Sequence, residues 1–325
     1  MKRLCVFAHW DRDNIIDDYC LYYLKALREI ADYVIFVSDS DIEKSGCSKE
    51  VQPEIKKLDG LADYVITGRH GEYDFGSYKR GFLLAEEKGL EFDELIWAND
   101  SCYGPFYPLE PIFRKMEKKK YDFWGMTKNP CGICVKKGAD KVCFYPHLQS
   151  CFLVFKPCVF NSSVFRNFVN GIKKEKRKND VVIKYEMGLY KSLKKAGFKS
   201  GVFINAYSHT ENSLLTRWDK LVQKYGFPFL KTAIAKNGSY WTGEVKDWDK
   251  IFTSGTGYPA ELIRKHSQRV LNLYENKYEK MNLYRKVRFR ILFHSPLEIR
   301  FCVIYLEKHL FKVLNTLCFN KLKKF

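Results

Sequence analysis

The chain has 325 residues, of which 46% are hydrophobic and 16% aromatic, so it can form a substantial core and is not expected to be disordered. Its formal net charge of +18 favours an anionic partner such as a nucleotide, a nucleic acid or a membrane surface. No apolar run of about eighteen residues is present, which argues against a membrane-spanning helix. Eleven cysteines without secretory features lead us to expect a reducing cytoplasm.

The first hundred residues alternate predicted strands and helices. Strands are expected at 4–10, 33–37, 64–67 and 94–98, with helices at 17–30, 54–58 and 81–88. This order implies parallel strands joined by right-handed crossovers. His9 and Asp39 fall at the ends of the first two strands, where Asp39 forms a turn, caps a helix or contacts a nucleotide.

The segment from Arg69 to Gly81 combines glycines, aromatic residues and charge. It contains the carboxylate of Asp74 and the cations Lys79 and Arg80, which are expected at the start of a helix. Such a set suits an anionic ligand that carries a ring. The simpler interpretation is a helix that starts near Gly76, with the aromatic residues in the core.

The central feature is the stretch from Leu95 to Pro105, in which a buried strand runs into Asn99, Asp100 and Ser101. Ligands of open α/β sheets gather at the carboxyl ends of strands, so Asp100 is placed to hold a divalent cation and, through it, a diphosphate. Alternatively, these residues form an Asx-type turn and cap the next helix.

In the middle of the chain we expect a helix at 112–120, a strand at 121–126 and another strand at 147–155. A cysteine-rich loop or hairpin connects these two strands. Cys131, Cys134 and Cys143 could bind zinc, but the second half of the usual zinc-ribbon spacing is missing, so free thiols are the default. At the entry of the later strand, His147, Gln149 and Ser150 either face a substrate or satisfy backbone groups.

Further along, a helix at 163–172 passes into a basic run at 173–178, which is a solvated charge run by default. Glu186 opens a helix that stops at Gly197, and it either complements the helix dipole or acts as a general base. His209 follows a returning strand at 202–204 and is structural, a phosphate contact or a metal ligand.

Beyond residue 240 the alternation of strands and helices stops, so we divide the chain into a domain at 1–240 and a helical, basic, amphipathic extension at 241–325. A helix is expected within 259–284 and another after Pro296. From Tyr284 to Phe325 there are ten lysines and arginines against two glutamates. This extension could bind an anionic membrane, pack on the first domain or contact a second copy in a homodimer.

Three motifs together resemble the rhamnan synthesis protein F family of bacterial glycosyltransferases over residues 4–236: Gly71 to Lys79, Asn99 to Pro105, and His147 to Ser150. The segment 226–231 is similar to the family's ending. The resemblance implies a GT-A-type, Rossmann-like mixed sheet flanked by helices, with a nucleotide-sugar donor at the strand tips. GT-A enzymes carry an Asp-x-Asp motif that binds a divalent metal; here the tip has Asp100 alone, which puts strong dependence on Mn²⁺ or Mg²⁺ in doubt.

The resemblance also implies roles for individual residues. Glu186, Leu189 and Gly197 match the spacing around the base of inverting GT-A enzymes, so Glu186 is the expected base and Asp100 the residue that stabilises the leaving diphosphate. The expected donor-binding residues are His9, Asp39, Asp74, Lys79, Arg80, Asn99, Asp100 and Ser101. The expected acceptor-binding residues are His147, Gln149 and Ser150, and the metal ligands Asp100 and His209.

The expected product is a cell-surface polysaccharide or lipopolysaccharide, with rhamnose the first candidate sugar and the acceptor a glycan or lipid-linked glycan. The expected location is the cytoplasmic, inner face of the membrane, as a peripheral protein. A non-catalytic scaffold of polysaccharide assembly is the main alternative. A nucleic-acid-binding protein is less favoured, because the basic residues sit in separate runs and no nucleic-acid module is visible.

Overall fold

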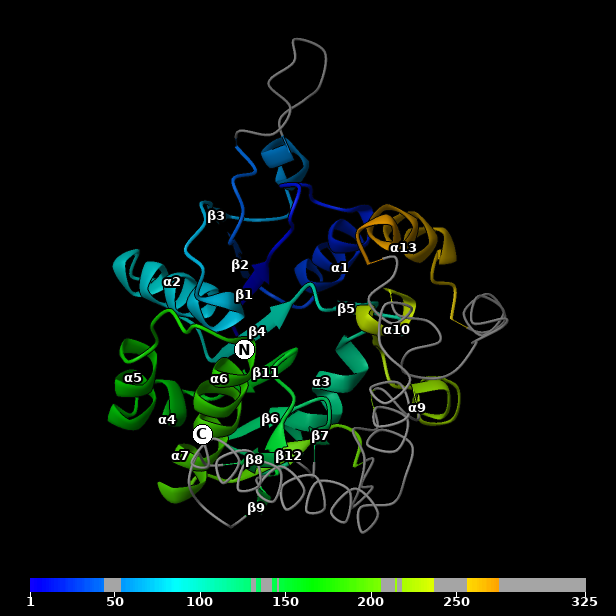
Figure 1. Cartoon of the computed structure of the whole chain (residues 1–325). Helices are drawn as coiled ribbons and strands as arrows, with labels where there is room; N and C mark the ends of the chain where they lie inside the picture. Colours follow the sequence, from blue (N-terminus) through cyan, green and yellow to red (C-terminus); the bar gives the residue numbers. More distant parts are fainter. Residues whose placement is uncertain are drawn as a thin grey trace, which may run out of the picture.

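The structure is a computed structural model that describes residues 1–43, 54–129, 133–135, 142–144, 146–205, 214, 218–236 and 256–274. Its centre is a seven-stranded sheet with the order β12-β6-β11-β4-β1-β2-β3 (Figure 1). The strands are β1 (Arg3–His9), β2 (Tyr33–Ser38), β3 (Tyr64–Ile66), β4 (Glu94–Asn99), β6 (Phe123–Gly125), β11 (Phe152–Phe155) and β12 (Ser200–Val202). Neighbours are parallel except at β11, which runs antiparallel to β4 and β6.

Helices cover both faces of this sheet, so the predicted α/β class with a mixed sheet flanked by helices is confirmed (Figure 1). Alternate strand residues serve the two faces: Cys5 and Phe7 belong to one buried cluster, Leu4 and Val6 to the other. One face carries α1 (Asp18–Arg28), α3 (Glu110–Glu117), α9 (Trp218–Tyr225) and α13 (Ala260–Tyr274). The other carries α2 (Tyr73–Glu87), α4 (Pro157–Phe160), α5 (Ser163–Asn170), α6 (Lys178–Val181) and α7 (Met187–Lys195).

Short elements complete the described fold. They are the 3-10 helix η1 (Glu54–Leu58), the π-helix η2 (Val182–Glu186), α10 (Thr232–Lys236), β5 (Cys102–Tyr103), β7 (Lys128–Asn129), β8 (Ile133–Val135), β9 (Val142–Phe144), β10 (His147–Leu148) and β13 (Leu230–Lys231). The expected hairpin in the cysteine-rich segment is present as β8 and β9, which pair antiparallel with Cys134 opposite Cys143. Cys131 lies outside the described residues, and the zinc hypothesis stays untested.

Two sequence predictions about element boundaries are wrong. The helix expected from residue 81 begins at Tyr73, so Lys79 and Arg80 lie within α2 rather than at its start. Gly76 is needed for packing inside the helix, because a Cβ there would lie 2.3 Å from the Cβ of Glu72. The strand expected at 147–155 is divided into β10, which pairs with β7 in a separate sheet, and β11 in the main sheet.

The predicted C-terminal extension is represented by residues 256–274, where α13 confirms the expected helix as far as Tyr274. α13 packs beside α1 and α10 (Figure 1). The helix expected after Pro296 lies outside the described residues, and the division at residue 240 stays a prediction. Within the described part of the chain, no helix combines the length and apolar character that crossing a membrane requires.

Candidate active site

The direction of the strands brings the polar strand ends to one edge of the sheet. β1, β2 and β4 are parallel and end at His9, Ser38 and Asn99. Because β11 is antiparallel to β4, its first residue, Phe152, pairs with Ala98. The residues that precede β11 therefore lie at the same edge of the sheet as the residues that follow β4. The sequence did not predict this neighbourhood, because hydrophobic periodicity gives no information on strand direction.

A cavity of about 660 Å³ opens at this edge of the sheet. Six residues predicted to bind the donor line it: His9, Asp39, Asp74, Asn99, Asp100 and Ser101. Pockets of this size hold drug-sized ligands and cofactors, and a nucleotide-sugar falls in that range. The cavity therefore lies at the strand tips where the sequence placed the ligand, and the roles of the individual residues stay predictions.

The tip of β4 is organised by hydrogen bonds to both sides. The Asn99 side-chain oxygen accepts the Ser101 backbone N–H at 3.1 Å, which is the Asx-type turn considered from the sequence. The same side chain donates to Asp74 at 3.1 Å. Asp100 Oδ2 accepts the backbone N–H of Trp10 at 2.7 Å, which fixes the carboxylate beside the loop that follows β1. The turn and the cavity-lining position therefore occur together.

Asp39 and His9 are buried residues that shape the cavity wall. Asp39 Oδ1 accepts the backbone N–H groups of His70 at 2.6 Å and Gly71 at 2.8 Å, so it also holds the loop after β3. His9 Nδ1 lies 2.9 Å from Ser38 Oγ. Burial lowers the pKa of His9 to about 4, so its imidazole is neutral at physiological pH.

Asp74 and Glu186 form a pair of interacting carboxylates. Burial, and then the charge of Glu186, raise the pKa of Asp74. Glu186 lies at the junction of η2 and α7, and its Oε1 accepts the backbone N–H of Ser150 at 2.8 Å. π-Helical turns are frequent at functional sites. The structure therefore brings the predicted base into contact with Ser150 and near enough to Asp74 to raise its pKa, although neither Glu186 nor Ser150 is among the cavity-lining residues.

The other predicted site residues have different surroundings. Lys79 Nζ donates to the carbonyls of Asn170 and Ile172 at the end of α5, and Arg80 pairs with Glu72 at 2.6 Å. Neither cation is among the cavity-lining residues. His147 and Gln149 are buried in and beside β10. His209 lies outside the described residues. The predicted roles of these five residues remain untested.

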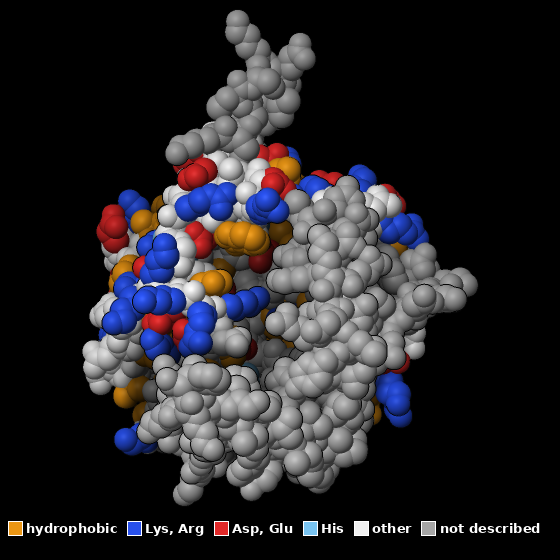
Figure 2. Space-filling view, in the orientation of Figure 1, with side chains coloured by type: hydrophobic (Ala, Val, Ile, Leu, Met, Phe, Trp, Pro, Cys, Tyr) orange, Lys and Arg blue, Asp and Glu red, His pale blue; other side chains and the backbone are white. Residues whose placement is uncertain are grey.

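Sequence reasoning missed the cations of this site. Lys174, Lys176 and Lys178, which we call the cavity lysines, line the cavity, and they come from the run that was assigned to solvent. Lys174 crosses the loop after β3 so closely that a Cβ on Gly71 would lie 3.0 Å from its Cε. Figure 2 shows Lys and Arg side chains gathered where α2, α5 and α6 lie in Figure 1. Only a three-dimensional structure reveals which strand tips such a run faces.

Lys231 is a further cation at the tip of β4. Its Nζ donates to Ser101 Oγ at 3.1 Å, and β13 pairs with β5 to hold it there. Burial opposes the charge of Lys231 and would lower its pKa. Electrostatic attraction to nearby acidic groups outweighs burial and raises the pKa of Lys231; these groups are Cys151, Cys102, Glu186 and Asp74. It is therefore a fixed positive charge beside the paired carboxylates.

Two aromatic side chains complete the cavity wall. Trp10 is 52% exposed and Tyr73 is 37% exposed, although both are large rings. Tyr73 also has a backbone φ of 60°, a conformation that bulky residues rarely adopt. Exposed rings and local backbone strain are common at ligand sites, where a flat ligand can stack on them.

The donor atoms at the tip of β4 favour one kind of metal binding over another. Among the described residues, no three His, Cys, Asp or Glu side chains are placed to hold a metal ion. Mg²⁺ is commonly held by one or two carboxylates together with substrate phosphates. Asp100 therefore suits a cation that arrives with a diphosphate.

Comparison with known families supports the resemblance described from the sequence. The family model described as Rhamnan synthesis protein F matches residues 34–308, which is most of the chain. The chain belongs to the rhamnan synthesis protein F family. The matched range contains the tips of β2 and β4, the cavity lysines, Glu186 and α13, whereas β1 precedes it.

Individual relatives of this rhamnan synthesis protein F member are distant. It is 24% identical over 150 residues to the uncharacterized protein y4gN of Sinorhizobium fredii, a match that covers 46% of this chain and 37% of that protein. The chain thus spans about a third of this curated relative. Among solved structures it is similar to core-mannan synthase A of Aspergillus fumigatus in its Mn/GDP form, with 11% identity, a TM-score of 0.36, and coverage of 62% of this chain and 73% of the other.

Proposed function

We propose that this protein is a glycosyltransferase that moves a sugar from a nucleotide-diphosphate donor to a growing cell-surface glycan. The observation that carries the proposal is the cavity at the strand tips, which is lined by the three cavity lysines together with Asp39, Asp74, Asp100 and Glu175. Membership of a family described by rhamnan synthesis supports a transferase role and makes a rhamnose-like hexose the first candidate sugar. The base and sugar of the donor are left to experiment.

The donor would lie along the tips of β1, β2 and β4. The cavity lysines would offset the negative charge of the diphosphate, which otherwise faces the four lining carboxylates Asp39, Asp74, Asp100 and Glu175. Lys231 is not a lining residue, but its bond to Ser101 adds a positive charge at the tip of β4. Trp10 and Tyr73 offer exposed rings on which a nucleobase or sugar ring can stack. In this proposal Lys79 and Arg80 support the fold of α2 and the end of α5. The cavity lysines take over the donor-binding role that the sequence analysis assigned to Lys79 and Arg80.

The proposed reaction is a single displacement at the anomeric carbon. Glu186 takes the proton of an acceptor hydroxyl as that oxygen forms a bond to the anomeric carbon. The bond from that carbon to the diphosphate breaks, and the nucleoside diphosphate leaves with the electron pair. The backbone N–H of Ser150 orients the Glu186 carboxylate, which supports an acceptor site beside the 147–150 segment. Such a displacement inverts the configuration of the sugar.

A divalent cation, Mn²⁺ or Mg²⁺, would bind to Asp100 together with the donor diphosphate and would supply additional charge neutralisation. No step of the proposal depends on it, because the lysines occupy the same region. The proposal predicts that the cation binds weakly without a nucleotide and more tightly with one.

The acceptor, the location and the assembly state are further parts of the proposal. A glycan or lipid-linked glycan acceptor and a peripheral position on the inner face of the membrane are supported by the basic composition of residues 284–325. A homodimer remains an alternative use of the same segment. A non-catalytic scaffold would keep the fold and lack turnover.

The direct test is release of nucleoside diphosphate. The purified protein is incubated with UDP-, GDP-, CDP- and dTDP-sugars, including dTDP-L-rhamnose, with and without Mn²⁺ and with short glycan acceptors. We expect release from one base and sugar combination, with the Asp100→Asn variant strongly impaired. Absence of release from every donor, combined with salt-sensitive binding to random DNA, would overturn the proposal in favour of a nucleic-acid-binding protein.

A further inference from the structure

The loop between β1 and α1, residues 10–17, is held by a side chain from α13. Arg269 Nη2 donates to Asp11 Oδ2 at 2.6 Å, across 258 positions of sequence. Its Nη1 lies 3.2 Å from Asp13 Oδ2, and its Nε donates to Asp17 Oδ1 at 3.1 Å. One guanidinium thus joins three carboxylates of a single short segment, using the several N–H groups of its planar fork.

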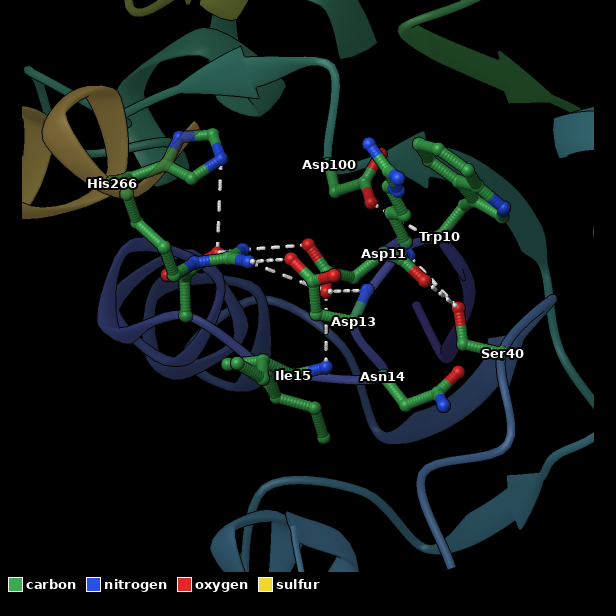
Figure 3. A network of polar contacts seen from close by, with 12 residues as sticks. Trp10, Asp11, Asp13, Asn14, Ile15, Ser40, Asp100 and His266 are labelled. Carbon is green, nitrogen blue, oxygen red and sulfur yellow. Dashed lines mark hydrogen bonds and ion pairs between the residues drawn. The ribbon is translucent and has the colours of Figure 1, made fainter. Parts of the chain in front are cut away.

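Two neighbouring side chains, Ser40 and His266, make further polar contacts around this junction. Figure 3 shows them together with Asp11 and Asp13. His266 lies one turn before Arg269 on α13, and its Nε2 is 3.7 Å from Asp17 Oδ2. The other ring nitrogen of His266 is 2.7 Å from the hydroxyl of Tyr103. α13 is therefore tied both to the start of α1 and to the segment that follows the tip of β4.

Asp11 transmits this contact to the cavity. Its Oδ1 accepts the backbone N–H groups of Asp13 at 2.8 Å and Ile15 at 3.1 Å, which closes the loop. Its own backbone N–H and carbonyl both bond to Ser40 Oγ at 2.8 Å. The preceding residue, Trp10, lines the cavity and donates its backbone N–H to Asp100 (Figure 3). A continuous chain of contacts therefore runs from Arg269 through Asp11 and Trp10 to Asp100.

The charges explain why this loop needs a partner. Asp11, Asp13 and Asp17 all approach one guanidinium, so without it three like charges would face one another at short distance. Burial opposes the charge of Asp11, but hydrogen bonds from Arg269 and from the loop backbone outweigh it and lower the pKa of Asp11. The guanidinium of Arg269 thus favours the ionised form of Asp11 and offsets the repulsion within the loop.

We infer that Arg269 is a positioning residue for the cavity: it holds the β1–α1 loop in the conformation in which Trp10 donates to Asp100. As far as the ligand is concerned, the inference rests on the proposed function, because Asp100 and Trp10 are the groups assigned to the donor. It makes α13, which lies beyond residue 240, part of the machinery that binds the donor.

The test compares Arg269→Gln and Arg269→Lys with a control, Arg264→Gln, on the same helix. Arg264 pairs with Glu261 on its own helix, so Arg264→Gln removes the same charge from α13 as Arg269→Gln does. Hydrogen exchange of peptides covering residues 10–17 reads the loop directly, and binding of UDP, GDP and dTDP reads the cavity. Arg269→Lys keeps the charge and loses the fork, so it should give an intermediate result.

In Arg269→Gln we expect exchange in residues 10–17 to accelerate about tenfold while the core strands β1 and β4 stay protected. Affinity for the nucleotide that binds the wild type best should fall about tenfold, because the competent loop is populated less. Arg264→Gln should match the wild type in both measurements. Adding Asp17→Asn to Arg269→Gln removes one repelling charge and should restore part of the protection, a rescue that simple loss of packing would not allow.

Unchanged exchange of residues 10–17 in Arg269→Gln would overturn the inference, and so would faster exchange with unaltered nucleotide affinity. If Arg269→Gln does not fold, the same two measurements are made on Arg269→Lys and on the double variant Arg269→Gln with Asp17→Asn. Unchanged exchange of residues 10–17, or faster exchange with unaltered nucleotide affinity, overturns the inference there too. If the wild type binds none of the nucleotides, the proposed function fails, and the exchange measurement still decides whether Arg269 holds the loop.

Discussion

Replacing Glu186 by Gln is the perturbation that examines the proposed chemistry most closely. Glu186 Oε1 accepts the Ser150 N–H at 2.8 Å, and the amide oxygen of Gln can accept the same bond. The local fold should therefore survive, with a change in stability within about 0.5 kcal/mol, as is usual where no buried contact is lost. The side chain would lose its capacity to take a proton.

The expected loss follows from the role of a general base, which contributes about 10²- to 10⁴-fold to a rate. We expect kcat for transfer to fall by that factor, which corresponds to about 3–5 kcal/mol of transition-state stabilisation. Donor affinity should stay within about twofold of wild type, since the diphosphate is held by the lysines and the tip of β4. Glu87→Gln, an exposed change at the end of α2, is the matched control.

The assay is steady-state release of nucleoside diphosphate in the presence of acceptor, with donor affinity measured separately. Near-normal turnover in Glu186→Gln would refute the assignment of Glu186 as base. Loss of turnover in Asp74→Asn alongside it would transfer the role to the neighbouring carboxylate, whose pKa is already raised. Loss of donor binding in Glu186→Gln would instead indicate a structural role for Glu186.

Three further predictions concern the charges around the cavity. Changing all three cavity lysines to Gln should weaken nucleotide binding about 10- to 100-fold at low salt and less at high salt. The same change at 118–120, an exposed basic run after α3, should have little effect on binding. Titration calorimetry at two salt concentrations checks this, and equal losses of affinity in the two triple variants would contradict it. The raised pKa of Asp74 means that folding favours its protonated form, so the stability that this form contributes is lost as pH rises through the raised pKa. Asp74→Asn, which is always neutral, should therefore raise Tm at pH 7.5, and the gain should disappear below about pH 4. A Tm no higher than that of the wild type at pH 7.5 would refute the argument that burial disfavours the Asp74 charge. Excess chelator should weaken nucleoside diphosphate binding in the wild type and leave Asp100→Asn unchanged, while equal weakening in both would show that the cation binds elsewhere.

The sheet was largely predictable because its strands are continuous buried runs bounded by polar turns. The runs ending at His9, Ser38 and Asn99 are buried along almost their whole length, as the apolar residues indicate. The direction of β11 was not predictable, because a four-residue apolar run has the same pattern whichever way it lies in the sheet. The site prediction depended on Asp39, Asp74 and Asp100 as strand-tip and helix-start residues, and all three line one cavity.

The parts of the site that sequence reasoning missed depend on long-range packing. The cavity lysines belong to a run of six basic or acidic residues, and nothing in such a run specifies the strand tip it will face. Arg269 lies on an amphipathic helix with several basic residues, and only the docking of α13 beside α1 selects it over Arg264 or Lys265. Lys79 and Arg80 were assigned to the ligand because the helix was expected to begin later than Tyr73.

The central claim is that the cavity at the tips of β1, β2 and β4 binds a nucleoside diphosphate-sugar. Equilibrium binding of UDP-, GDP-, CDP- and dTDP-sugars to the wild type and to Asp100→Asn tests it most directly. The account predicts one preferred base, with a dissociation constant between about 1 μM and 1 mM, the range usual for enzyme substrates, and at least tenfold weaker binding by Asp100→Asn. Equal affinity of both proteins for that donor, or no binding of any donor to the wild type, would contradict it.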